Sequence, residues 1–296
     1  MKLSMTVRDC LYLNWALPVE TLPAPPASLH YQLHTWEGQD WVFASALLFH
    51  QDAVRLAALP LIRVGYPQFN LRFYVLDREG IPSVLFRRML MPGWVAPGVR
   101  LVSHQPAVAA RLDFPRPAVD AGDGPWRWRV EHGGTLEVRA WRDMSAISAG
   151  AGIGEGPRLG SWDDTVRYFQ MRMRGFVQTS EGRLRRIDVR KPSAVAVAWP
   201  LRAEVSGAQL LPDLFCLPSN GFAWPPLHSA WLCPEIPFAF DLGLAPKEVG
   251  TVTRSMPQPA AGRVVGAWRA TRANAALREQ SQWEETEPRE ARRASC

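Results

Sequence analysis

Residues 66–88 read Tyr-Pro-Gln-Phe-Asn-Leu-Arg-Phe-Tyr-Val-Leu-Asp-Arg-Glu-Gly-Ile-Pro-Ser-Val-Leu-Phe-Arg-Arg, and this stretch predicts a β-hairpin with its turn at residues 77–80. Apolar and polar side chains alternate before the turn: Phe69, Leu71, Phe73 and Val75 against Asn70, Arg72 and Tyr74. A period of two places the two sets on opposite faces of a strand. The polar face therefore meets either solvent or a cavity.

Several other stretches predict hairpins, each with turn residues between two runs of strand-forming residues. They pair residues 29–33 with 41–49, 126–130 with 135–141, and 175–179 with 183–189. Residues 50–65 lack such a pattern, and we expect a loop there with one helical turn that ends at Pro60. The chain is thus predicted to be mainly β with a few helices.

One segment predicts a helix clearly. Ser161 is a suitable N-cap, with Asp164 three residues later to complete a capping box. Apolar side chains then recur at helical spacing: Trp162, Val166, Phe169 and Met173. We therefore expect a helix over residues 161–174, packed outside the β structure.

The central hairpin, together with Trp-Glu-Gly-Gln-Asp-Trp-Val-Phe at 36–43, resembles the YqjF-like family of uncharacterised bacterial proteins, a domain of unknown function. Trp15-Ala-Leu-Pro18 and Trp199-Pro200-Leu201 resemble further motifs of that family, so the resemblance spans roughly residues 10–240. It implies the acetoacetate-decarboxylase-like fold, a cone-shaped β-barrel around a small-molecule cavity. We expect one such domain over residues 1–240 and a loosely attached or disordered tail with a short helix over 241–296.

The resemblance also implies a chemistry that this chain lacks the residues to perform. Acetoacetate decarboxylase forms a Schiff base through a lysine activated by a second lysine beside it. Its motif comes closest to residues 104–108, His-Gln-Pro-Ala-Val, where there is no lysine, and the chain's lysines are Lys2, Lys191 and Lys247. Arginine stays protonated and cannot replace the amine nucleophile. Schiff-base decarboxylation is therefore not expected, and whether the protein is an enzyme at all stays open.

The polar faces of the predicted strands offer candidates for binding a small organic acid: Asn70, Arg72, Arg87, His104 and His228. A guanidinium in a desolvated cavity binds carboxylate through two parallel hydrogen bonds. If residues 77–80 form the turn, Arg72 can approach Arg87 across the hairpin. The alternative is that Arg72 and Arg87 face solvent or pair with Asp113 or Glu137, and that the histidines are structural.

A cluster of basic residues suggests a second class of function. Residues 167–191 contain eight basic side chains against Glu181 and Asp188, so this region could bind nucleic acid or another polyanion. No nucleic-acid motif accompanies it, and we treat this as an alternative. A third reading is a barrel without enzymatic activity that serves as an interaction module.

Composition bounds the remaining possibilities. The 296 residues carry a net charge of +6, which permits anionic partners without requiring them. The four cysteines stand far apart, without a Cys-x-x-Cys pair, and His30 and His34 are too far apart along a strand to share a zinc ion, so we expect no metal and no cofactor. A reducing cytoplasm fits this cysteine usage, and we expect no membrane-spanning helix.

Overall fold

The computed structural model describes residues 2–56, 59–103, 105–118, 122–145, 156–179, 182–190, 196–217 and 223–241. Asp241 ends the last described strand. The prediction of a tail with a short helix over residues 241–296 therefore falls, beyond Asp241, outside the described residues.

Strands dominate the described residues. They are β1 (Lys2–Pro18), β2 (His30–Tyr31), β3 (Leu33–Trp36), β4 (Gln39–Leu56), β5 (Leu59–Leu76), β6 (Pro82–Met91), β7 (Ala107–Ala109), β8 (Arg111–Asp113), β9 (Trp126–Glu131), β10 (Thr135–Arg142), β11 (Arg174–Gln178), β12 (Leu184–Arg190), β13 (Trp199–Ser206) and β14 (Ser229–Asp241). The described helices are α1 (Ala96–Ser103), α3 (Trp162–Gln170) and α4 (Leu211–Leu214), with 3-10 turns η1 (Val19–Thr21) and η2 (Ala208–Leu210). None of these helices is long and apolar enough to cross a membrane.

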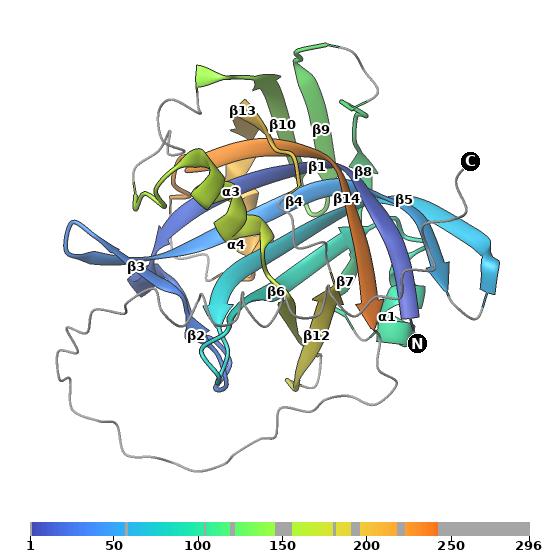
Figure 1. Cartoon of the computed structure of the whole chain (residues 1–296), viewed down its shortest axis with the longest axis horizontal. Helices are drawn as coiled ribbons and strands as arrows, with labels where there is room; N and C mark the ends of the chain where they lie inside the picture. Colours follow the sequence, from blue (N-terminus) through green and yellow to red (C-terminus); the bar gives the residue numbers. More distant parts are fainter. Residues whose placement is uncertain are drawn as a thin grey trace, which may run out of the picture. The chain divides into compact units, whose positions relative to one another are not determined.

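Strand pairing runs in a ring through the longest strands. β1 pairs with β4, β4 with β5, and β5 with β6, all antiparallel, and Figure 1 shows these four side by side. β6 pairs with β11 in parallel, β11 with β12, and β12 with β14. β14 lies antiparallel to β1 along most of its length and returns the ring to its start. This confirms the predicted mainly β barrel.

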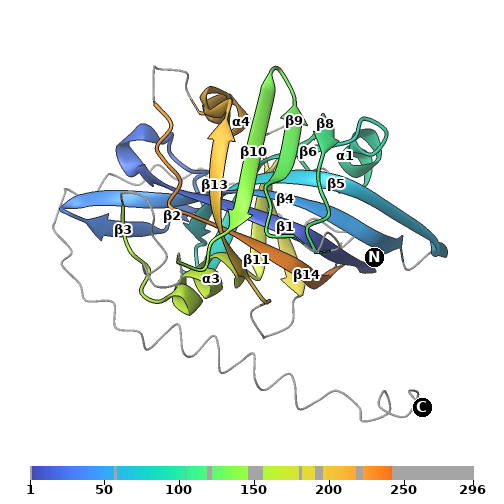
Figure 2. The same cartoon turned by 90° about the horizontal axis from the view of Figure 1, so that it is seen from above.

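A second group of strands, β8, β9, β10 and β13, joins the ring where β13 pairs with the beginning of β14. In Figure 2, β9, β10 and β13 run across the direction of β1, β4 and β5. Trp126, Trp128 and Val130 of β9 point into the apolar core that these strands share with the ring. The tryptophan side chains of β9 therefore face the core.

The prediction of a loop over residues 50–65 is wrong. β4 extends to Leu56 and β5 begins at Leu59, so most of this segment is strand. β4 pairs with β1 on one edge and β5 on the other, which satisfies its backbone groups whatever the side-chain pattern. Backbone pairing on both edges therefore overrides a weak local sequence signal here.

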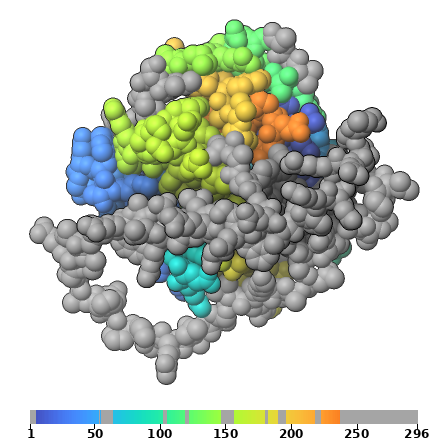
Figure 3. All heavy atoms as spheres, viewed as in Figure 1, coloured from blue at the N-terminus to red at the C-terminus, as the bar shows by residue number. Residues whose placement is uncertain are grey.

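The strands β1, β4 and β5 separate two apolar clusters. Leu11, Val42 and Phe73 belong to the large core shared with β8–β10 and β13. Their neighbours Tyr12, Phe43 and Tyr74 point the other way and pack with Phe169 of α3 and Trp231 of β14. α3 lies at the surface of the face seen in Figure 3, with Asp163 and Arg167 exposed.

Candidate functional site

Alternation along β5 places Arg72 on the face that α3 covers. Phe73 points into the large core, so Arg72 and Tyr74 on either side of it point toward α3. Arg72 is only 5% exposed there. A charged side chain this deep is unusual unless it is paired, so its surroundings decide what it can do.

The Arg72 guanidinium is held through its Nη2 atom. Nη2 donates to the Tyr74 hydroxyl at 2.9 Å and to the Phe169 carbonyl at 3.0 Å. Its carbon lies 5.5 Å from the Tyr12 ring centre and 5.3 Å from that of Tyr74, within the range of cation–π attraction. Nε is buried without a hydrogen-bond partner in the described part of the chain.

A second buried arginine reaches the same place from the end of α3. The helix begins at the predicted capping box, in which the Ser161 hydroxyl accepts from the Asp164 backbone N–H, and it ends at Gln170. The short link to β11 then carries Arg172, also 5% exposed. Its guanidinium carbon lies 4.2 Å from the Tyr168 ring centre and 5.2 Å from that of Tyr74. We call Tyr12, Arg72, Tyr74, Tyr168 and Arg172 the arginine–tyrosine cluster.

Arg172 offers more unused hydrogen-bonding capacity than Arg72. Both Nε and Nη2 of Arg172 are buried without a partner among the described residues. Two adjacent N–H groups of a guanidinium can together take both oxygens of one carboxylate. The cluster therefore contains one such pair of donors on Arg172 and a single further donor, Nε, on Arg72.

The cluster holds two positive charges and no compensating negative charge from the described residues. No described carboxylate forms an ion pair with either guanidinium. Burial raises the pKa of both Tyr12 and Tyr168, so their hydroxyls stay neutral near pH 7. Burial, and more weakly the Arg72 charge, lowers the pKa of Arg172, but an arginine remains protonated at that pH. Uncompensated buried charge is costly, which makes the cluster attractive to an anion.

Two histidines border the cluster in their neutral form. Burial, assisted by Arg172 and His228, lowers the pKa of His34 to about 4. Its Nε2 lies 3.0 Å from the Tyr168 hydroxyl. Burial also lowers the pKa of His228 to about 4, and its ring packs edge-on against Phe43. Neither ring adds charge near pH 7.

A chain of buried hydrogen bonds links Arg72 to His228. The Tyr74 hydroxyl lies 2.9 Å from Ser45 Oγ, which donates to Asn14 Oδ1 at 2.5 Å. Asn14 Nδ2 in turn donates to Ser229 Oγ at 3.2 Å. His228 Nε2 lies 3.0 Å from the Pro157 carbonyl and must donate to it, which leaves Nδ1 to accept from Ser229 Oγ at 3.2 Å. The chain fixes the Tyr74 hydroxyl and the His228 tautomer.

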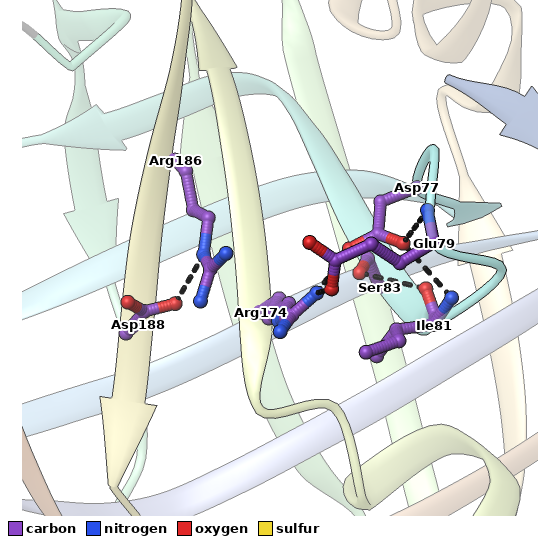
Figure 4. A network of polar contacts seen from close by, with 7 residues as sticks. All are labelled: Asp77, Glu79, Ile81, Ser83, Arg174, Arg186 and Asp188. Atoms are coloured by element: carbon purple, nitrogen blue, oxygen red, sulfur yellow. Dashed lines mark hydrogen bonds and ion pairs between the residues drawn. The ribbon is translucent and has the colours of Figure 1, made fainter. Parts of the chain in front are cut away.

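Neighbouring basic residues are paired with carboxylates instead. Figure 4 shows Arg174 on β11 reaching the hairpin turn, where Nη1 lies 2.6 Å from Asp77 and 2.7 Å from Glu79. On β12, Arg186 Nε lies 2.6 Å from Asp188. With Arg172 buried as well, three of the basic side chains that suggested a polyanion-binding surface over residues 167–191 point into the protein or into ion pairs.

The predicted site residues lie in different places. Arg72 and His228 lie on the α3 side and are joined by the hydrogen-bond chain. Asn70 shares that face but accepts from Gln68 Nε2 at 2.6 Å, in an amide ladder with Gln51. Arg87 donates to the carbonyls of Phe215 and Cys216, at 3.2 and 3.3 Å. His104 lies outside the described residues.

Arg72 and Arg87 do not meet because of a β-bulge. Leu71 stands opposite Arg88 and Arg72 opposite Phe86, which leaves Arg87 as the extra residue. Arg87 thereby turns to the side of Phe215, a member of the large core. A bulge is not visible in the alternation of either strand, so it could not be predicted from the sequence.

Sequence reasoning missed Arg172, Tyr12, Tyr168 and His34 as neighbours of Arg72. The charge pattern groups Arg172 with the basic residues of 167–191, and His34 is considered only as a zinc ligand together with His30. A signal for Arg172 existed in its position directly after an amphipathic helix, close to Tyr168 and Phe169. No feature of the sequence pointed to Tyr12, which lies on β1 and reaches Arg72 across β4.

Comparison with protein families gives one match, which covers most of the described chain. The profile of the family DUF2071, described as "Uncharacterized conserved protein (COG2071)", matches residues 4–208. No curated protein matches the sequence.

Solved structures share the fold. The enduracididine biosynthesis enzyme MppR with HEPES buffer bound superposes with a TM-score of 0.55 at 12% identity, over 84% of this chain and 88% of that one. MppR complexed with pyruvate gives a TM-score of 0.51 at 12% identity, over 81% and 88%. An acetoacetate decarboxylase-like enzyme from Sphingomonas wittichii RW1 gives 0.48 at 12% identity, over 83% and 93%. At such identity the likeness concerns the fold alone, and the predicted fold class is confirmed.

Proposed function

The chain belongs to the DUF2071 family of uncharacterised conserved proteins, and from that premise we propose that it binds a small carboxylate-bearing molecule between Arg72 and Arg172. The observation that carries this proposal is the pair of arginines, each 5% exposed, with three buried donor nitrogens that no described residue uses. Structural ion pairs would have used those donors, as Arg174 does with Asp77 and Glu79.

The donors suit a carboxylate by geometry as well as charge. Nε and Nη2 of Arg172 can bind both oxygens of one carboxylate in parallel. Nε of Arg72 can add a third hydrogen bond, while its Nη2 stays anchored on Tyr74 and Phe169. Neutral tyrosine and histidine rings line the cluster, so nothing described there repels an anion.

The similarity of fold to MppR supports the binding of a small molecule by analogy only. One of the similar structures holds MppR complexed with pyruvate, itself a small carboxylate. The analogy does not extend to a lysine mechanism, since Lys2, Lys191 and Lys247 are the chain's lysines and none belongs to the cluster as described. The proposed function is therefore binding, without a Schiff base.

A thermal-shift screen of small organic acids tests the proposal. We expect at least one acid to raise the melting temperature of the wild type and to lose this effect in Arg72→Leu, because losing one charged partner of a desolvated contact costs on the order of 2–5 kcal/mol. Because the variant also loses the hydrogen bonds to Tyr74 and Phe169, each protein is compared with its own melting temperature without ligand.

Arg139→Leu is the matched control for that screen. Arg139 is 56% exposed on β10 and pairs with Glu137, so its removal deletes one positive charge far from the cluster. The control should keep the full ligand response. A ligand that stabilises the wild type and Arg72→Leu equally would place the binding site elsewhere.

A further inference from the structure

The charge of the arginine–tyrosine cluster sets the charge of the ligand that fits it. Arg72 and Arg172 contribute two buried positive charges, and no described residue in contact with them contributes a negative one. A monocarboxylate would leave one of the two charges uncompensated in a region of low dielectric. A dianion would neutralise both, and the gain is larger in the interior than in water.

We infer that the ligand is a small dicarboxylate. This deepens the proposed function and rests on it: the cluster must bind carboxylates before it can prefer two of them.

The free donors fall into two groups that can hold two separate carboxylates. Arg172 presents the adjacent Nε and Nη2, and Arg72 presents Nε. Both guanidinium carbons lie within 5.3 Å of the Tyr74 ring centre, so they are at most twice that distance apart. A carbon chain of a few atoms between two carboxylates spans such a separation. One carboxylate can therefore take the paired donors of Arg172 while the other reaches Arg72.

The aromatic rings around Arg172 do not replace an ion pair in stabilising its guanidinium. The Tyr168 and Tyr74 rings attract the Arg172 cation, but cation–π contacts offer no hydrogen-bond acceptor to Nε and Nη2, which stay unpaired among the described residues. The Tyr74 hydroxyl is already engaged by Arg72 and Ser45. A second carboxylate supplies the negative charge that the neutral tyrosines lack, together with acceptors for the donors that remain free.

Calorimetric titration of the full chain tests the inference with ligands matched in shape. Malonate and succinate are compared with their monomethyl esters, which carry one charge less, and inorganic phosphate provides a dianion without carboxylates. In the wild type we expect each dicarboxylate to bind at least about tenfold more tightly than its ester, a difference typical of one added charge-assisted contact. Phosphate should bind more weakly than the better dicarboxylate.

Two variants identify the source of the preference. In Arg172→Gln the preference for dicarboxylate over ester should shrink to about twofold or less, because a single guanidinium remains. In Arg172→Lys the charge remains and much of the preference should survive, although the paired donors are lost. Circular dichroism spectra of both variants serve as the control that they are folded.

The outcomes separate the inference from the proposed function. Equal binding of dicarboxylates and esters by the wild type, or tighter binding of phosphate, overturns the dicarboxylate inference and leaves the carboxylate site intact. A preference that persists unchanged in Arg172→Gln overturns it too, because Arg172 is then not its source. Absence of binding by every carboxylate tested overturns the proposed function and the inference with it.

Discussion

Arg172 and Arg174 stand two residues apart, yet their guanidiniums meet opposite environments. Arg174 reaches the exposed hairpin turn and finds Asp77 and Glu79. Arg172 turns inward beneath α3 and finds tyrosine rings and a second arginine. Strand β11 begins at Arg174. The arginine on the strand therefore forms a structural ion pair, whereas Arg172, which precedes the strand, is a candidate binding group.

At the same scale, His228 should make stability depend on pH. The ring is neutral in the folded protein, where burial lowers its pKa from 6.5 to about 4. The unfolded chain binds a proton below pH 6.5 and the folded one only below about pH 4, so the stability present at neutral pH is lost as the pH falls between these values. The loss from a shift of this size is on the order of 3 kcal/mol.

Urea denaturation at pH 7 and pH 5 measures the larger part of this loss, about 2 kcal/mol. His228→Gln keeps a donor toward the Pro157 carbonyl and removes the titrating group. The variant should be less stable than the wild type at pH 7, but its stability should fall less between pH 7 and pH 5. Some fall should remain, because the pKa of His34 is lowered in the same direction. An identical fall in both proteins would show that His228 does not titrate as a buried neutral ring.

At the scale of elements, α3 illustrates what local interactions can fix. Its start was predicted correctly, since the Ser161 hydroxyl and the Asp164 side chain cap each other across three residues. Its end was predicted four residues too late, at 174 rather than Gln170. Beyond Gln170 the backbone turns so that Arg174 can join β11 beside β6, a contact between distant segments.

Because α3 supplies Tyr168 to the cluster and the Phe169 carbonyl that holds Arg72, we expect its cap to contribute to stability. Ser161→Ala removes the side-chain acceptor of the Asp164 N–H and should lower the free energy of unfolding by about 1 kcal/mol. Asp163→Ala, next in the first turn and outside the capping box, should cost only about 0.3–0.5 kcal/mol. Chemical denaturation measures both. Equal effects of the two substitutions would contradict a role for the capping box.

β5 shows the same division between local pattern and packing. The predicted alternation of Phe69, Leu71 and Phe73 with Arg72 and Tyr74 is confirmed in the two clusters on either side of the strand. The alternation left open whether the polar face meets solvent or the interior. Burial of Arg72 at 5% exposure answers that question, and it depends on α3, which lies about a hundred residues along the chain.

At the scale of the whole molecule, an acetoacetate-decarboxylase-like barrel occurs here without the lysine pair that Schiff-base chemistry needs. We expect borohydride reduction in the presence of acetoacetate or pyruvate, followed by intact-mass measurement, to show no covalent adduct. Arginine cannot form the imine, and Lys2, Lys191 and Lys247 are far apart in sequence. A lysine-dependent decarboxylase treated in parallel provides the positive control. An adduct on any of the three lysines would contradict the expectation.

The sequence by itself determined the features that depend on neighbouring residues. Period-two alternation defined the hairpin at 66–88, the capping box defined the start of α3, and the lack of a lysine pair predicts that no Schiff base forms. Each of these is legible within a few residues because dihedral preferences and side-chain direction act over that range.

Only the tertiary structure decided which polar side chains meet. The bond from Arg72 to the Phe169 carbonyl joins residues 97 positions apart, and the approach of Arg72 to Tyr12 crosses an intervening strand. The bulge between Leu71 and Arg72 turned Arg87 to the other face, and the arginine that lies near Arg72 is Arg172 instead. Such contacts follow from how strands and a helix pack to satisfy backbone hydrogen bonds and bury apolar surface across the whole chain, and no local pattern encodes them.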